Sequence, residues 1–178
     1  DHYQRYSPYR VVDAVSGETD HPVGTGATVD GLTLDAASGA ARTQFIIAES
    51  ELSGLGHIDA LRMTATQAGA SLDRLIIRMR NIAATDLAGP VDTGLTTVYD
   101  HGVQLVDGVN TLVLTQPFTW AGAGNNILVE MDVEDRTPGA APTLAASATA
   151  HPVVHAEREG HLLFNDGRVG VPASVFAT

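Results

Sequence analysis

The sequence predicts an all-β protein, a two-sheet β-sandwich of jelly-roll type with about ten short strands. Apolar residues alternate with polar ones far more often than they recur at helical spacing. Clusters of Gly, Pro, Asp and Asn separate the alternating segments, as turns between strands require. The stretch "ESELSG" (49–54) leaves room for one helical turn and little more. These observations favour two packed sheets over a helical architecture.

The first strong strand signal lies at 41–48, "ARTQFIIA". Thr43, Phe45 and Ile47 occupy every second position, so they share one face of the expected strand. The dipeptide Asp107-Gly108 stands between two apolar runs and predicts a hairpin turn. Weaker alternation predicts further strands at 29–34, 57–66, 95–99, 103–106, 109–115, 143–151, 161–165 and 169–176.

Two other expected strands carry opposite charges at alternate positions. The segment 72–80 has arginines on one face and apolar residues on the other, and 126–134 has carboxylates and apolar residues in the same arrangement. Opposite charges that face each other across neighbouring strands stabilise a sheet by about 0.2–1 kcal/mol per pair. We therefore expect the two stripes to pair on an outer sheet face rather than to bind an anion. The arginine stripe is Arg74, Arg78 and Arg80, and the acidic stripe is Glu130, Asp132 and Glu134.

The chain length suits one domain. A chain of 178 residues can form a substantial core, whereas two domains would each be small. Apolar residues make up 44% of the chain and charged residues 17%, which is typical of a folded protein. We expect a single sandwich domain over 25–178, preceded by an extended N-terminal arm over 1–24.

The sequence contains neither cysteine nor lysine. This composition excludes disulfides and thiolate metal sites, and also Schiff-base catalysis and a phosphate-loop lysine. The formal net charge of −11 opposes binding to nucleic acid and to anionic lipids. No apolar run approaches the roughly 18 residues that a membrane span needs, so we expect none.

Two stretches resemble parts of a known kind of module. They are "RTQFIIAESELSGLGHIDALRM" (42–63), with a Ser-Glu-Leu turn between strands, and "QPFTWAGAGNNILVEMDVED" (116–135), with a Gly/Asn turn before a strand. The pattern is similar to a β-sandwich module that recurs in large secreted and surface proteins of bacteria. The resemblance implies an extracellular or cell-surface protein of this fold. It implies structural roles for Phe118 and Trp120 and transfers no catalytic residue.

Three histidines, His151, His155 and His161, have the spacing H-x₃-H-x₅-H of one class of zinc proteases. That chemistry needs the first two histidines on one helical turn, followed by a Glu, but here Pro152 takes the place of the Glu. Alternation predicts a strand instead, which separates His151 from His155 by roughly 13 Å. We therefore expect a surface or interface role for these histidines rather than a zinc site.

The tetrapeptide "VDTG" (91–94) resembles the signature of aspartic proteases, in which two such turns contribute one Asp each. The sequence offers no second copy, and an Asp-Thr-Gly turn is common. The expectation is therefore that the protein is not an enzyme.

Carboxylates at the end of one expected strand could hold a structural Ca²⁺. They are Asp132, Glu134 and Asp135, and no EF-hand loop accompanies them. The alternative is that they are solvated acidic groups.

The N-terminal segment "DHYQRYSPYRVV" (1–12) holds three of the four tyrosines of the chain, interleaved with arginines. Ser7-Pro8 favours an extended conformation in which a spacing of three places side chains along one side. Tyrosine and arginine are preferred anchors of protein interfaces. The candidate assembly residues are Tyr3, Arg5, Tyr6, Tyr9 and Arg10.

Two functions follow as hypotheses. The first is a non-catalytic, extracellular structural protein whose arm docks on another copy, so that it self-assembles into a filament or surface layer by strand addition. The alternative is a carbohydrate-binding or adhesive module for cell-surface glycans. That alternative requires Tyr99 and Trp120 to be exposed on one face for sugar stacking.

Overall fold

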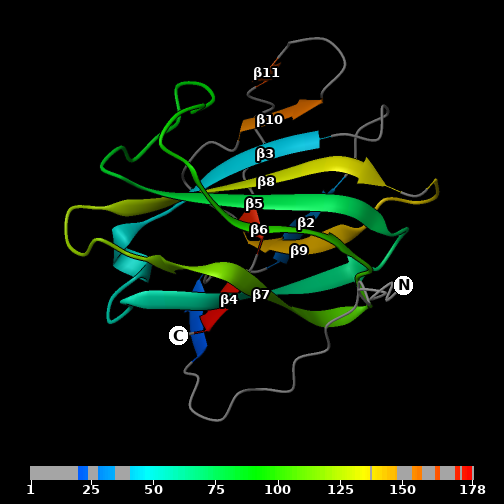
Figure 1. Ribbon diagram of the computed structural model, residues 1–178, viewed down its shortest axis with the longest axis horizontal. Coiled ribbons are helices and arrows are strands. Elements are labelled where there is room, and N and C mark those ends of the chain that lie inside the picture. Colours follow the sequence, from blue (N-terminus) through cyan, green and yellow to red (C-terminus); the bar gives the residue numbers. More distant parts are fainter. Residues whose placement is uncertain are drawn as a thin grey trace, which may run out of the picture.

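A computed structural model describes residues 20–23, 28–34, 41–136, 138–147, 154–157, 163–164, 171–172 and 174–177. Within these ranges the protein is all-β, and two antiparallel sheets pack face to face (Figure 1). The described part of the chain contains one short 3₁₀ turn, η1 (Glu49–Glu51), where the sequence predicts a single helical turn. The expectation of a two-sheet sandwich is therefore confirmed.

The first sheet has seven described strands and is organised around β4. One edge of β4 pairs with β7, and the other edge pairs with β13 and then with β9. The strand β1 pairs with the far side of β13, and β2 pairs with β9. The strands are β1 (Asp20–Val23), β2 (Thr28–Thr33), β4 (His57–Gln67), β7 (Gly108–Thr119), β9 (Thr143–Ser147), β12 (Val171–Pro172) and β13 (Ser174–Ala177).

The second sheet has the strand order β11-β10-β3-β8-β5-β6. The central strand β8 lies between β3 and β5, and Glu130 of β8 is in register with Gln44 of β3 and Arg78 of β5. The strands are β3 (Ala41–Ile47), β5 (Leu72–Ile82), β6 (Thr96–Val103), β8 (Asn126–Arg136), β10 (Val154–Glu157) and β11 (Leu163–Phe164).

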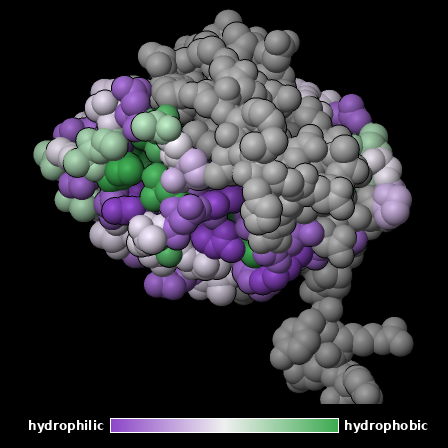
Figure 2. Space-filling view, turned by 90° about the horizontal axis from the view of Figure 1, so that it is seen from above, coloured by the Kyte–Doolittle hydropathy of each residue, from purple (hydrophilic) through white to green (hydrophobic). Residues whose placement is uncertain are grey.

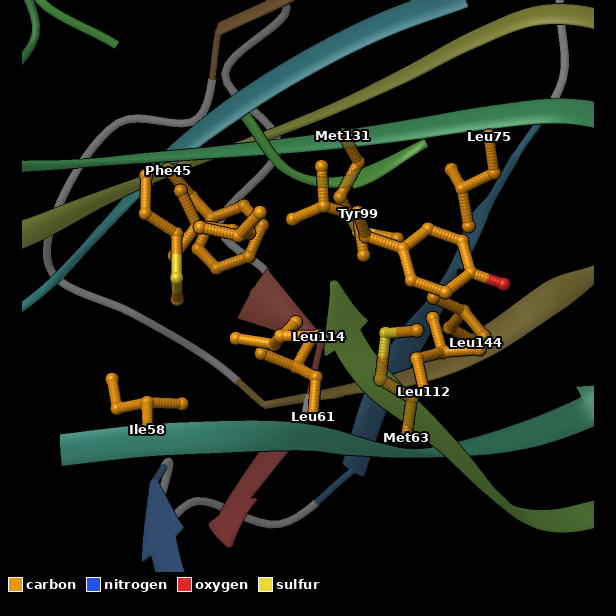
Figure 3. Packing of buried hydrophobic residues seen from close by; sticks show 14 of the residues in the cluster. Phe45, Ile58, Leu61, Met63, Leu75, Tyr99, Leu112, Leu114, Met131 and Leu144 are labelled. Atoms are coloured by element: carbon orange, nitrogen blue, oxygen red, sulfur yellow. The ribbon is translucent and has the colours of Figure 1, made fainter. Parts of the chain in front are cut away.

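The main core fills the space between the sheets. Alternation on the strands directs one set of apolar side chains inward, and Phe45, Ile77 and Met131 are each at most 1% exposed. In Figure 3, Phe45 and Met131 face Leu61 and other residues of the first sheet across this space. Burial of this apolar surface is the main stabilising contribution to the sandwich.

The connection between β6 and β7 differs from the sequence-based expectation. The segments 95–99 and 103–106 were expected as two strands, but one strand runs from Thr96 to Val103. Gly102 does not break this strand; a Cβ there would lie 2.9 Å from the carbonyl oxygen of Asp73, so the glycine permits a close approach between strands. The turn then follows, closed by the buried amide of Asn110, which bonds the backbone N–H and C=O of Val106 at 2.9 and 2.8 Å.

The connection between β5 and β6 is much longer than two adjacent antiparallel strands need. It comprises residues 83–95, which we call the strap. The strap is the green loop at the upper left of Figure 1. Structureless connections of this length are uncommon in compact domains, and many have a functional role.

Candidate functional site

The strap covers part of the outer face of the second sheet. Leu87 of the strap packs on Ile46 of β3 and Leu128 of β8, and the three residues are at most 3% exposed. This cluster is separate from the main core, because residues on this face point away from the other sheet. Figure 2, which shows the molecule from above relative to Figure 1, has hydrophobic side chains beside a hydrophilic area.

The side-chain amide of Gln44 binds the backbone of the strap. Its Nε2 donates to the carbonyl oxygen of Val91 at 2.8 Å, and its Oε1 accepts from the backbone N–H of Val91 at 2.9 Å. The amide thus satisfies both polar backbone groups of one residue, as a neighbouring strand would. Gln44 is 1% exposed, so both bonds lie away from solvent.

Arg42 holds the next residue of the strap. Its Nη1 donates to Asp92 Oδ1 at 2.6 Å, and its Nη2 donates to the carbonyl oxygen of Val91 at 3.1 Å. The side chain of Asp92 is 63% exposed, whereas that of Arg42 is 25% exposed. The charged contact therefore lies at the rim of the site, and the amide contact lies beneath it.

Glu130 lies beneath both of these side chains and is completely buried. It accepts hydrogen bonds from Arg42 Nε at 2.6 Å, from Gln44 Nε2 at 2.5 Å and from Arg78 Nη1 at 2.5 Å. A buried carboxylate is strongly destabilising unless charges and donors compensate it. Here two guanidinium groups provide that compensation, and Glu130 in turn orients Arg42 and Gln44 toward the strap.

The sequence-based expectation that the two charged stripes pair across strands is confirmed for most of their members. Arg78 also donates to Asp132 at 3.1 Å, and Arg74 pairs with Glu134. Asp132 is 2% exposed, so the alternative of a solvated acidic group is wrong for it, and Glu130 of the same stripe is completely buried. Arg80 differs from the other members, since it donates to the Thr93 carbonyl of the strap at 2.8 Å.

The carboxylates of this network stabilise the charged form of the two arginines, Arg42 and Arg78. Burial alone would lower the pKa of Arg42, but hydrogen bonds from its guanidinium to Asp92 and Glu130 outweigh burial and raise the pKa. The same holds for Arg78, whose pKa is raised because its bonds to Glu130 and Asp132 outweigh its burial. Both arginines therefore remain charged, as the buried carboxylates require.

The stripe continues to an exposed ion pair at the edge strand β6. Arg74 donates from Nε and Nη2 to the two carboxylate oxygens of Asp100, at 2.9 and 2.8 Å. The hydrogen bonds from Arg74 lower the pKa of Asp100. Because both side chains are more than 40% exposed, solvent screens this pair far more than it screens the buried network.

Two of the three candidate calcium ligands are in ion pairs. The carboxylates of Asp132 and Glu134 face Arg78 and Arg74, and the side chain of Asp135 lies outside the described residues. Among the described side chains, no three histidine or acidic groups converge as metal ligands.

The two candidate sugar-stacking residues occupy different settings. Tyr99 lies between the sheets in Figure 3 and is 7% exposed, and burial raises the pKa of its hydroxyl. Trp120 is half-buried against the core, and its Nε1 donates to the carbonyl oxygen of Asn125 at 2.8 Å. Tyr99 therefore lacks the open ring face that a sugar would stack on, which removes half of the pair on which the glycan-binding hypothesis depends.

The structure describes one histidine of the first protease-like motif and all of the second motif. His155 lies in β10, where its backbone is in register with Thr43 and Phe164, while His151 and His161 lie outside the described residues. Asp92 of "VDTG" belongs to the strap and pairs with Arg42. The Asp-Thr-Gly turn thus fastens a surface connection to the sheet.

The candidate assembly residues Tyr3, Arg5, Tyr6, Tyr9 and Arg10 lie outside the described residues. The segment expected as an arm, 1–24, ends in a described strand, because Asp20–Val23 form β1. Arg62 of β4 pairs with Asp20, which fixes the start of that strand. Residues 13–19 separate the segment 1–12 from β1, which is the terminal strand in the described order of the first sheet.

Sequence reasoning missed the contact between Gln44 and Arg42 on β3 and the strap. The available signal was weak: these two polar residues alternate with Thr43 and Phe45 and so share the face opposite the core. Nothing in the sequence indicates that a segment 47 positions away would cover them.

Comparison of the chain with protein-family models, with curated proteins and with solved structures gives no significant match. No helix in the described part of the chain is long and apolar enough to cross a membrane.

Proposed function

We propose that the protein is a non-catalytic structural protein of the cell exterior, which self-assembles through its N-terminal segment. Tyr3, Arg5, Tyr6, Tyr9 and Arg10 would dock that segment on the sandwich of another copy. Strand addition at a sheet edge would supply backbone hydrogen bonds, and the tyrosines would fill sites beside it.

The observation that carries this proposal is the distribution of charge. Between residues 41 and 134 eleven carboxylates outnumber five arginines, and four of those arginines are in ion pairs within the sandwich. The segment 1–12 has the opposite balance, with two arginines and one carboxylate. A cationic, aromatic segment on an acidic body is electrostatically complementary to a second body of the same kind.

The position of the segment supports the same proposal. It precedes β1, which is the terminal strand of its sheet among the described strands, so an arm that extends from β1 would start at this edge. Edge strands present backbone groups that can pair with another chain.

We also propose a jelly-roll strand order for the sandwich. The pairings β1-β13-β4-β7 in one sheet and β3-β8-β5-β6 in the other support it, because each sheet alternates early and late strands of the chain. Two interleaved Greek keys produce this alternation.

Deletion of residues 1–12 tests the proposed function. We expect fibres or sheets of the full chain in electron micrographs, and a folded monomer in sedimentation velocity after deletion. Replacement of Tyr3, Tyr6 and Tyr9 by Ser should weaken assembly, while the matched replacement by Phe retains the rings and should preserve most of it. Assembly that survives the deletion would show that the segment is not the docking element.

A further inference from the structure

The outer face of β3 has the features of a peptide-binding site. Gln44 pairs with both backbone polar groups of Val91, and Arg42 pairs with the carboxylate of Asp92. Peptide-recognition sites commonly combine main-chain hydrogen bonds, which give affinity, with a charged or apolar contact, which gives specificity. The strap thus binds to its own sheet as a ligand would bind.

The way in which the strap is held supports this comparison. The backbone hydrogen bonds found outside the strands in the described residues include none between the strap and the sheet beneath it. Side chains of the sheet hold the strap instead: Gln44, Arg42, Arg80 and Asn126, the last of which donates to the carbonyl oxygen of Ala84 at 2.8 Å, beside the apolar packing of Leu87. A segment held in this way can separate without breaking a strand pairing, so it can open while the sandwich stays folded.

The site is also built independently of the strap. Glu130 fixes Arg42 and Gln44 from below, and Arg78 fixes Glu130 from the β5 side. These contacts lie within the sheet and do not involve any strap residue. The recognition groups are therefore preorganised, which reduces the entropic cost of binding a ligand.

We propose that Arg42 and Gln44 form a binding site for an acidic peptide segment, which the strap occupies in its own chain and which the strap of a second copy can occupy when the first strap opens. Every copy carries a segment that fits this site, because the strap itself shows the fit. Exchange between two copies is reciprocal, so each pair of copies makes the contact twice around a two-fold axis. This inference is independent of the role proposed for the N-terminal segment.

Two complementary variants of the full chain test the exchange. Asp92→Ala weakens the hold of the strap but leaves the site intact, and Arg42→Ala damages the site but leaves Asp92 in the strap. Neither variant alone can form a complete exchanged contact, whereas each mixed pair can form one, between the strap of the Arg42→Ala chain and the site of the Asp92→Ala chain. We expect association between the differently labelled variants, measured by energy transfer, to exceed that within either variant alone.

A synthetic peptide of residues 87–94, "LAGPVDTG", tests whether the association uses the contact between the strap and the site on β3. It should compete with the mixed association, and the same peptide with Asn in place of Asp92 should compete about tenfold less well, because a charge-assisted hydrogen bond is lost. The matched control replaces Asp92→Ala by Asp59→Ala, which removes an exposed carboxylate on β4, and should show no excess association.

Arg42→Ala could unfold the sheet locally, because Glu130 would lose a partner. Arg42→Lys therefore serves as a second site variant: it keeps a cation near Glu130 but lacks the planar fork that reaches Asp92 and Val91. If both site variants are folded by circular dichroism and neither mixture shows excess association, the proposal is wrong. Excess association that both peptides reduce equally would also overturn it. Association through the N-terminal segment would occur in every mixture alike and would not respond to the peptide.

Discussion

The two faces of β8 are both closed to solvent, but by different means. On the inner face Met131 is 1% exposed and packs against the other sheet. On the outer face Glu130 is completely buried, and two guanidinium groups and an amide surround it. The stability contributed by the inner face depends on the amount of apolar area that it buries. The stability contributed by the outer face depends on the matching of individual charges and hydrogen bonds.

This difference implies different responses to substitution. Apolar cores tolerate exchanges that preserve volume. A buried ionic network does not tolerate the loss of one member, because the remaining charges stay buried without compensation. The same strand should therefore tolerate conservative substitutions on its inner face and few substitutions on its outer face.

The largest expected effect is that of Glu130→Ala. The substitution leaves Arg42 and Arg78 beside each other without their shared carboxylate, and should lower the free energy of unfolding by about 3–5 kcal/mol. The inner-face neighbour provides the comparison: Met131→Leu preserves volume and should cost less than about 1.5 kcal/mol. Urea denaturation of both variants measures the two values, and equal losses would contradict the distinction between the faces.

A combined replacement serves as the control for this prediction. Replacing Glu130→Leu, Arg42→Met, Arg78→Leu and Asp132→Leu together removes both buried carboxylates along with the two arginines that compensate them, and keeps the site filled. Its free energy of unfolding should equal or exceed that of the native chain. A loss as large as that of Glu130→Ala would mean that packing, rather than unpaired charge, explains the single variant.

A smaller effect is expected for Asn126→Ala. Its side chain accepts from the backbone N–H of Glu49 at 2.7 Å and donates to the strap carbonyl of Ala84, so it supports both η1 and the strap. Loss of both bonds should cost about 1–3 kcal/mol in urea denaturation. Asn126→Asp retains the acceptor for Glu49 and replaces the donor to Ala84 with a carboxylate oxygen that repels the Ala84 carbonyl. Amide exchange should therefore become faster in the strap but not in η1; an unchanged strap would show that this contact does not hold it.

The smallest effect is expected at the exposed pair of Arg74 and Asp100. Hydrogen bonds from Arg74 lower the pKa of Asp100 below its ordinary 3.8 in the folded protein, so the pair stabilises the fold above pH 3.8 and this contribution is lost as the pH falls through the lowered pKa. Asp100→Asn should cost less than about 1 kcal/mol at neutral pH. The difference in melting temperature should disappear at strongly acidic pH and shrink in high salt. A difference that persists in acid would indicate a cause other than the ion pair.

The period-two pattern was sufficient to predict the sheet strands that surround this site. The expected strands 41–48, 72–80 and 126–134 correspond to β3, β5 and β8, and the expected pairing of arginines with carboxylates is confirmed for Arg74 and Arg78. Alternation fixes which residues share a face, and complementary charge then favours neighbouring strands.

The position of the strap and the burial of Glu130 could not be predicted in the same way. Residues 83–95 show no period that indicates a strand or a helix, and their position depends on Gln44, which is distant in the sequence. An acidic residue at alternate positions, such as Glu130, is normally solvated. Its burial depends on a tertiary contact that local sequence does not encode.

The pairing of β1 with β13 has a mechanical consequence. Asp20 lies opposite Ala177 in an antiparallel register, so the start of one strand and the end of the other are neighbours. Tension applied through these two residues acts along the hydrogen bonds between the strands, because antiparallel bonds run perpendicular to the strand direction. The bonds would then break one after another, as a zipper opens, instead of resisting together in shear. A fibre built from such units would stretch at low force if its tension passed through this pair, and would be stiff only if its contacts directed the tension through β4 or β8.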